Sequence, residues 1–310
     1  MPDRVLQAMH MPSPNIYEGE VVEITDQVLV DLCECAQTTV GTALIYIGNG
    51  HAAWEAALVN LLSEGDRALV VSTGTFATAW GVIAESVGVV VETLEFGMLR
   101  AANPATITEY LSRPESQGIK AVMVCQTDTA SSCNNDIAAV RKAIDSAQHP
   151  ALYLVDCVAS FACEEMRMDE WGVDCIIAGS QKGLMVPAGL GFNIISPKAM
   201  AAREAFPGRV SAYWDWLPRI DPEIFYMRFA GTLPTHHLYG LRTALEMIVR
   251  EGEPIPFASS FLLPVLLPHF LHCRCRGHRK RVGASPHTRH SSACCTRPLG
   301  LRWWRLESEY

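Results

Sequence analysis

Between about residues 40 and 200, short apolar runs alternate with amphipathic segments, and this alternation is the strongest constraint on the fold. The apolar runs are typical of buried strands: 43–48, 67–73, 89–96, 121–127, 151–157 and 175–180. Segments with apolar residues at helical spacing are predicted helices: 51–62, 76–87, 136–147 and, further on, 234–250. Such a pattern predicts a mostly parallel sheet with helices on both faces. Because ligands of these sheets bind at the carboxyl ends of the strands, we expect the functional residues there.

The first candidate is Lys182, in the segment GSQKGLM (179–185) that follows a predicted buried strand. It is one of only five lysines in the chain and stands among small and apolar residues. Desolvation favours the neutral amine of a lysine, and that form makes a Schiff base with a carbonyl compound. Without further context, a lysine on an exposed turn is the simpler explanation.

The second candidate is Asp156, which lies at the end of the apolar run ALYLVDC (151–157). A buried carboxylate is costly unless it has a partner. A protonated pyridine nitrogen is such a partner, and its charge keeps the ring an electron sink. The alternative is an aspartate that caps the next turn.

The third candidate is the turn GNGH (48–51), between a predicted strand and a predicted helix. Its glycines let the backbone approach a ligand, and the first N–H groups of the helix are free to bind a phosphate. Since any tight turn from a strand to a helix can have this sequence, the motif is weak evidence by itself.

Taken together, these segments resemble the class V aminotransferases, which are pyridoxal-phosphate enzymes of fold type I. The resemblance is greatest to the serine–glyoxylate and alanine–glyoxylate (serine–pyruvate) branch. It covers roughly residues 2–252, through PDRVLQAMH (2–10), QHPALYLVDCVAS (148–160), DEWGVDCIIAGSQKGLMVPAGLGF (169–192) and LYGLRTALEMI (238–248). It implies the α/β large domain of a fold type I transferase, with a small C-terminal domain that is truncated or atypical here.

The resemblance also implies roles for individual residues. Lys182 would form the Schiff base with the cofactor, Asp156 would contact the pyridinium nitrogen, and Phe76 would stack on the ring, unless it is simply a core residue. Thr232 would reach the phosphate of a neighbouring subunit, which implies a homodimer. The remaining cofactor-binding positions are Asn49 (in place of serine), Gly50, His51, Thr129, Val158 and Gln181. Ser132 stands where the family has a glycine.

The activity implied is a ping-pong transamination from serine or alanine to glyoxylate or pyruvate, with Lys182 as nucleophile and general base. One alternative is a cofactor-binding homologue with weak or no activity, because no arginine after residue 253 matches the family's carboxylate-binding motif. Another is a related lyase such as a cysteine desulfurase. Gln181 argues against that reading, because by family analogy a desulfurase would have histidine there.

Composition and apolar periodicity predict three regions: an N-terminal segment (1–20), a cofactor-binding domain (21–252) and a tail rich in Cys, His and Arg (253–310). Nine of the 25 basic residues, but only two of the 33 acidic ones, lie in 271–310. A metal or nucleic-acid site there is disfavoured by the cysteine spacing and by the acidic remainder of the chain. The tail's amino-acid composition, without helical or strand periodicity, is what we expect of a shifted reading frame, an early ending or an unusual splice product.

The eleven cysteines and the absence of an apolar N-terminal leader predict a cytoplasmic protein with reduced thiols. No apolar run is long enough to predict a membrane span. We expect small amino acids and 2-oxo acids as partners, and no nucleic acid, membrane or metal.

Overall fold

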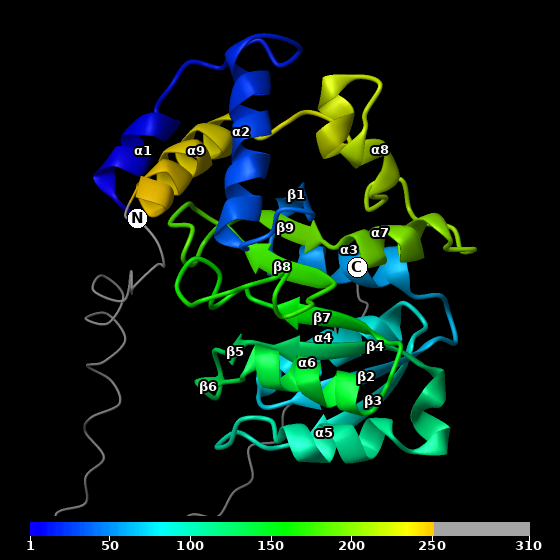
Figure 1. Cartoon of the computed structure of the whole chain (residues 1–310). Coiled ribbons are helices and arrows are strands. Elements are labelled where there is room, and N and C mark those ends of the chain that lie inside the picture. The colour runs from blue at the N-terminus through cyan, green and yellow to red at the C-terminus, as the bar shows by residue number, and fades with distance from the viewer. Residues whose placement is uncertain (251–310) are drawn as a thin grey trace, which may run out of the picture. The chain divides into compact units, whose positions relative to one another are not determined.

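The computed structural model describes residues 1–250; the predicted tail at 253–310 lies outside the described residues. Within them, the main sheet has seven strands in the order β1-β9-β8-β7-β4-β2-β3 (Figure 1). The strands are β1 (Thr42–Gly48), β2 (Arg67–Ser72), β3 (Val90–Glu95), β4 (Ile119–Cys125), β7 (Leu152–Asp156), β8 (Cys175–Gly179) and β9 (Gly189–Ile195). A short antiparallel pair, β5 (Thr127–Asp128) and β6 (Cys133–Asn134), follows β4.

The sheet is mostly parallel, as predicted. Strands β3, β2, β4, β7 and β8 pair in parallel, and each of the six predicted runs forms a strand. The strand that was not predicted is β9, which lies antiparallel between β1 and β8. It restores a common direction to β1 and β8, so the carboxyl ends of β1, β2, β4, β7 and β8 meet at one edge of the sheet.

The longer helices are α2 (Glu20–Cys35), α3 (Gly50–Leu61), α4 (Thr75–Ser86), α6 (Ile137–Ser146) and α9 (Thr235–Arg250). Shorter ones are α1 (Asp3–Met9), α5 (Pro104–Leu111), α7 (Pro197–Glu204), α8 (Leu217–Ile220) and the 3₁₀ turns η1 (Pro114–Gly118) and η2 (Phe225–Phe229). The four predicted helices are confirmed as α3, α4, α6 and α9. Helix α2, which was not predicted, packs against α9, with Arg242 Nη1 3.0 Å from Asp31 Oδ2.

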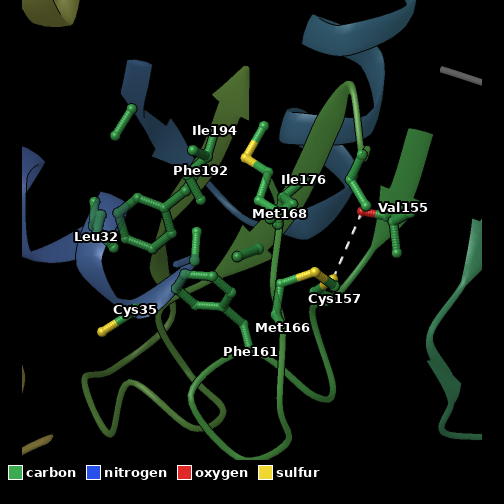
Figure 2. Close-up of a cluster of buried hydrophobic side chains, with 14 of the residues drawn as sticks. Leu32, Cys35, Val155, Cys157, Phe161, Met166, Met168, Ile176, Phe192 and Ile194 are labelled. Atoms are coloured by element: carbon green, nitrogen blue, oxygen red, sulfur yellow. Dashed lines mark hydrogen bonds between the residues drawn. The ribbon is translucent and has the colours of Figure 1, made fainter. Parts of the chain in front are cut away.

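Both faces of the sheet are buried, which explains why its strands read as continuous apolar runs. In β7, Tyr153 and Val155 pack into one layer together with α2, α5, α6 and α9, while Leu152 and Leu154 pack into the other with α3 and α4. The two sets of helices lie on opposite sides of the sheet in Figure 1. Figure 2 shows part of the first layer, in which Leu32 of α2 lies beside Phe192 of β9.

Two further observations bear on the expectations from sequence. The cysteines of the described part, four of them buried, form no disulfide. None of the helices among residues 1–250 combines the length and the apolar character that a membrane span needs.

Candidate active site

A cavity of about 160 Å³ lies at the edge of the sheet where the parallel strands end. Eight of the ten residues predicted to bind the cofactor line it: Gly50, His51, Phe76, Thr129, Asp156, Val158, Gln181 and Lys182. Trp54, Thr127 and Ala159 complete the lining and were not predicted. A larger hollow, of about 680 Å³, lies between α2 and the start of β1 but contains none of the predicted residues. The predicted cofactor-binding residues therefore line the smaller of these two cavities.

Asp156 is the buried acid of the cavity, with 5% of its surface exposed. Its Oδ1 atom accepts a hydrogen bond from the Val158 N–H at 2.8 Å, and its Oδ2 atom accepts one from the Cys125 thiol at 3.4 Å. Burial raises the pKa of this carboxyl to about 6, against the opposing effect of these two donors and of Trp54. No ion pair in the described part of the chain includes Asp156. Asp156 is thus a buried carboxylate without a cationic partner, and a protonated pyridine nitrogen would supply that partner.

Lys182 follows β8 in a turn that is closed by Ser180, whose hydroxyl donates to the Pro187 carbonyl at 2.7 Å. The neighbours Leu184 and Val186 are buried, but Lys182 itself is exposed at the cavity. The desolvation expected for this lysine is therefore not found, because its neighbours rather than its own side chain pack into the core.

Gly183 lets the lysine turn lie directly on the loop that follows β7. A Cβ atom at this position would overlap the Phe161 carbonyl and lie 2.6 Å from Cys163 Sγ. Real Cβ atoms do not come this close to backbone oxygens, so only glycine fits. The parallel pairing of β7 with β8 places the two strand ends side by side, and the contact at Gly183 packs the lysine turn against the loop beyond Asp156.

The phosphate turn predicted at Asn49–His51 forms the N-terminus of α3. Asn49 caps the helix, because its side-chain oxygen accepts hydrogen bonds from the N–H groups of His51 (3.0 Å) and Ala52 (3.3 Å). It does not line the cavity, whereas Gly50 and His51 do. Gly50 packs so closely on Val158 that a Cβ would lie 2.7 Å from Val158 Cγ2.

His51 and Phe76 both belong to an aromatic group around Trp54. The His51 ring centroid lies 4.4 Å from that of Trp54, and burial lowers the pKa of His51. Phe76 is half-buried, with its ring 6.4 Å from Trp54, which in turn stacks on Trp80. Trp54 is one helical turn beyond Gly50, and this spacing is the sequence signal that could have placed it in the site.

Asp128 connects the loop that carries Thr129 to the helix that carries Phe76. Its Oδ2 atom accepts from the Phe76 N–H (2.8 Å) and the Ala77 N–H (3.0 Å), and its Oδ1 atom accepts from the Ala130 N–H (3.0 Å). It therefore acts as the N-terminal cap of α4 although it is distant in sequence, where Gly74 offers no side chain. Sequence reasoning missed this residue because nothing local marks it as a cap.

Ser132, which replaces the family glycine, has φ 58°. This left-handed conformation accounts for the glycine that the resemblance predicts at this position. Thr232 is exposed, in the stretch between η2 and α9, and does not line the cavity of its own chain. Its expected contact with a second subunit stays a prediction.

Two buried polar atoms of the lining have no hydrogen-bond partner among the described residues, the Trp54 Nε1 and the Gln181 Oε1. Five other buried polar atoms of the described residues also lack partners, but these two belong to residues that line the cavity, where a ligand atom would satisfy them. With a carboxylate that lacks a cation, an aromatic side chain and a helix N-terminus, these groups fit pyridoxal phosphate, an aromatic cation that carries an anionic group.

Comparison with known proteins agrees with this arrangement. The sequence model for "Aminotransferase class-V" matches residues 23–254. The chain is 40% identical over 260 residues to a serine–glyoxylate aminotransferase of Methylorubrum extorquens and 35% identical over 252 residues to one of Arabidopsis thaliana. Each alignment covers 81% of this chain and 63% of the relative, so the chain spans less than two thirds of the length of these relatives.

A solved structure shares the fold. The ureidoglycine–glyoxylate aminotransferase of Bacillus subtilis superposes with a TM-score of 0.73 at 27% sequence identity, over 80% of this chain and 63% of that one.

Proposed function

Because the chain belongs to the class V aminotransferase family, we propose that residues 21–252 form a pyridoxal-phosphate-binding domain that transfers an amino group from serine or alanine to glyoxylate or pyruvate. The observation that carries the proposal is the meeting of Lys182, Asp156 and Phe76 in one cavity, although they come from three separate stretches of the chain. The relatives named serine–glyoxylate aminotransferase support the choice of substrates.

When bound, pyridoxal phosphate supplies an electron sink that stabilises negative charge on the α-carbon of an amino acid. The protein's part begins with Asp156. Its buried carboxylate would accept a hydrogen bond from the ring nitrogen and keep that nitrogen protonated, since an anion in a low-dielectric site favours a neighbouring cation. Phe76 contributes an aromatic face for offset stacking on the ring.

Lys182 has two tasks. Its Nζ atom would hold the cofactor through its aldehyde group, and its free amine would act as the base that takes the proton from the α-carbon of the amino acid and delivers it to the carbon that receives the amino group. The exposure of Lys182 at the cavity leaves the amine accessible to an incoming substrate.

The phosphate would be held at the start of α3, by the Gly50 N–H and by the side-chain amide of Gln181, both of which belong to residues that line the cavity. Asn49 occupies the N–H groups of His51 and Ala52 with its own oxygen, so it would support the phosphate end of the site by capping α3. Thr232 of a second subunit would complete this end of the site, which makes the proposed working unit a homodimer.

A second candidate function is a protein that holds the cofactor without turning it over. It is favoured by one observation: none of the arginines in residues 1–250 lines the cavity, although an arginine is the side chain best suited to grip a substrate carboxylate.

The visible absorption spectrum of the full chain with pyridoxal phosphate tests both candidates. A transaminase shows the band of lysine-bound cofactor, loses it on addition of L-serine and recovers it with glyoxylate. Lys182→Ala should lack the band, while Lys142→Ala, which removes an exposed lysine of α6, should keep it. A band in wild type that L-serine leaves unchanged favours the second candidate. A band that survives in Lys182→Ala refutes the assignment of the lysine.

A further inference from the structure

Asp156 is held from both sides, and only one of its two donors is a main-chain group. The Val158 N–H is fixed by the backbone just beyond β7 and binds Oδ1. The donor to Oδ2 is the side chain of Cys125, the last residue of β4, whose backbone pairs with Asp156 in the parallel ladder. Both side chains are buried, with 0% and 5% of their surfaces exposed. The contact is therefore formed inside the sheet and excludes water.

We propose that Cys125 is a positioning residue of the cofactor site, whose thiol fixes Oδ2 of Asp156 and governs how readily that carboxylate gives up its proton. The inference rests on the proposed function, since it concerns the acid that faces the cofactor ring.

The physical reason lies in the choice of donor. A thiol is a weak hydrogen-bond donor, and a carboxylate stabilised by weak donors in a buried site binds a proton readily. A hydroxyl in the same place would form a shorter, charge-assisted bond and stabilise the anion further. Cysteine at 125 thus orients the carboxylate but leaves its negative charge largely uncompensated, and the cationic ring nitrogen supplies the remaining compensation.

Other groups around Asp156 do not replace this contact. Asp128, beyond β4, opposes the ionisation of Asp156. Burial and the neighbouring Asp156 raise the pKa of the Cys157 thiol, next along the chain. Trp54 and His51 approach from α3 and Lys182 from the turn after β8, all as lining of the same cavity. The Trp54 N–H favours the ionised form, but it makes no hydrogen bond within the described residues. Cys125 is therefore the side chain that holds Oδ2.

The test is an infrared titration of the full chain prepared without cofactor. The Asp156→Asn variant identifies the carboxylic acid band that disappears as Asp156 ionises. We expect Cys125→Ser to lower the midpoint of this titration by about one pH unit and Cys125→Ala to raise it, because the donor is strengthened in one and removed in the other. Cys175→Ser is the matched control, since Cys175 is an equally buried strand thiol that is not bonded to Asp156.

A second measurement follows the infrared S–H band of the chain without any substitution at Cys125. In the wild-type chain, an S–H stretching band should shift at the same pH at which Asp156 ionises, and this shift should be absent from Asp156→Asn. This readout decides the matter even when a Cys125 variant fails to fold. An unchanged midpoint in Cys125→Ser, an equal change in Cys175→Ser, or an S–H band that ignores the titration would each overturn the inference.

Affinity for pyridoxal phosphate, followed by quenching of tryptophan fluorescence across the same pH range, separates this inference from the proposed function. Affinity that weakens below the Asp156 midpoint, with a break that moves to lower pH in Cys125→Ser, supports both. A chain that binds no cofactor while its midpoint still responds to Cys125 refutes the function and leaves the contact established.

Discussion

Replacement of Asp156 by asparagine should stabilise the cofactor-free chain while it weakens cofactor binding. The carboxyl has a pKa of about 6 in the folded protein, raised from 3.8 by burial. In the unfolded chain the group is solvated, so the folded protein binds its proton more tightly. An acid of this kind destabilises the folded state at every pH above its unfolded pKa.

The size of the effect follows from the two pKa values. At 1.36 kcal/mol per pKa unit, the ionised carboxylate costs about 3 kcal/mol of folding free energy at pH 8 and about 1.6 kcal/mol at pH 5. Asparagine removes this cost but leaves the Cys125 thiol without its acceptor, which offsets about 1 kcal/mol. The net gain is therefore about 2 kcal/mol at pH 8 and about 0.5 kcal/mol at pH 5.

The measurement is urea unfolding of both cofactor-free chains at pH 5, 6 and 8, with the free energy of unfolding taken from the midpoint and the slope. Below about pH 3 the carboxyl is protonated in both states, and the two chains should be equally stable apart from the lost thiol contact. The reasoning is refuted by a stability difference that does not change with pH, or by an asparagine variant that is less stable at pH 8. Added pyridoxal phosphate should reverse the order, because it stabilises the wild type more strongly.

Two further predictions concern the backbone of the site. Gly183→Ala should destabilise the chain by about 2 kcal/mol or more, because its Cβ would overlap the Phe161 carbonyl, and it should abolish the absorption band; thermal unfolding and the spectrum check both. Ser132→Gly should raise stability by about 1 kcal/mol in urea, since φ 58° strains any side-chain residue. Its control is Ser131→Gly, which should destabilise, and a loss of stability in Ser132→Gly would contradict the argument.

Much of the fold could be predicted because the information is local. Runs such as 151–157 are apolar along their whole length since both faces of the sheet are covered, and each predicted run forms a strand. The edge at which Lys182 and Asp156 meet follows from the direction of parallel strands. Strand β9 (GLGFNII) was not predicted, and its antiparallel direction depends on the partners β1 and β8 on either side.

Eight of the ten residues predicted to bind the cofactor line the candidate cavity, but their contacts could not be predicted. The sequence by itself determined which residue types lie at the edge of the sheet, because residue identity and distance from a strand end are properties of the chain. Only the tertiary structure decided that Asn49 caps α3, that Lys182 is exposed, that Asp128 caps α4 and that a thiol holds Asp156. Each of these depends on where atoms from other elements come to lie, because burial and hydrogen-bond partners arise from packing between segments far apart in the chain.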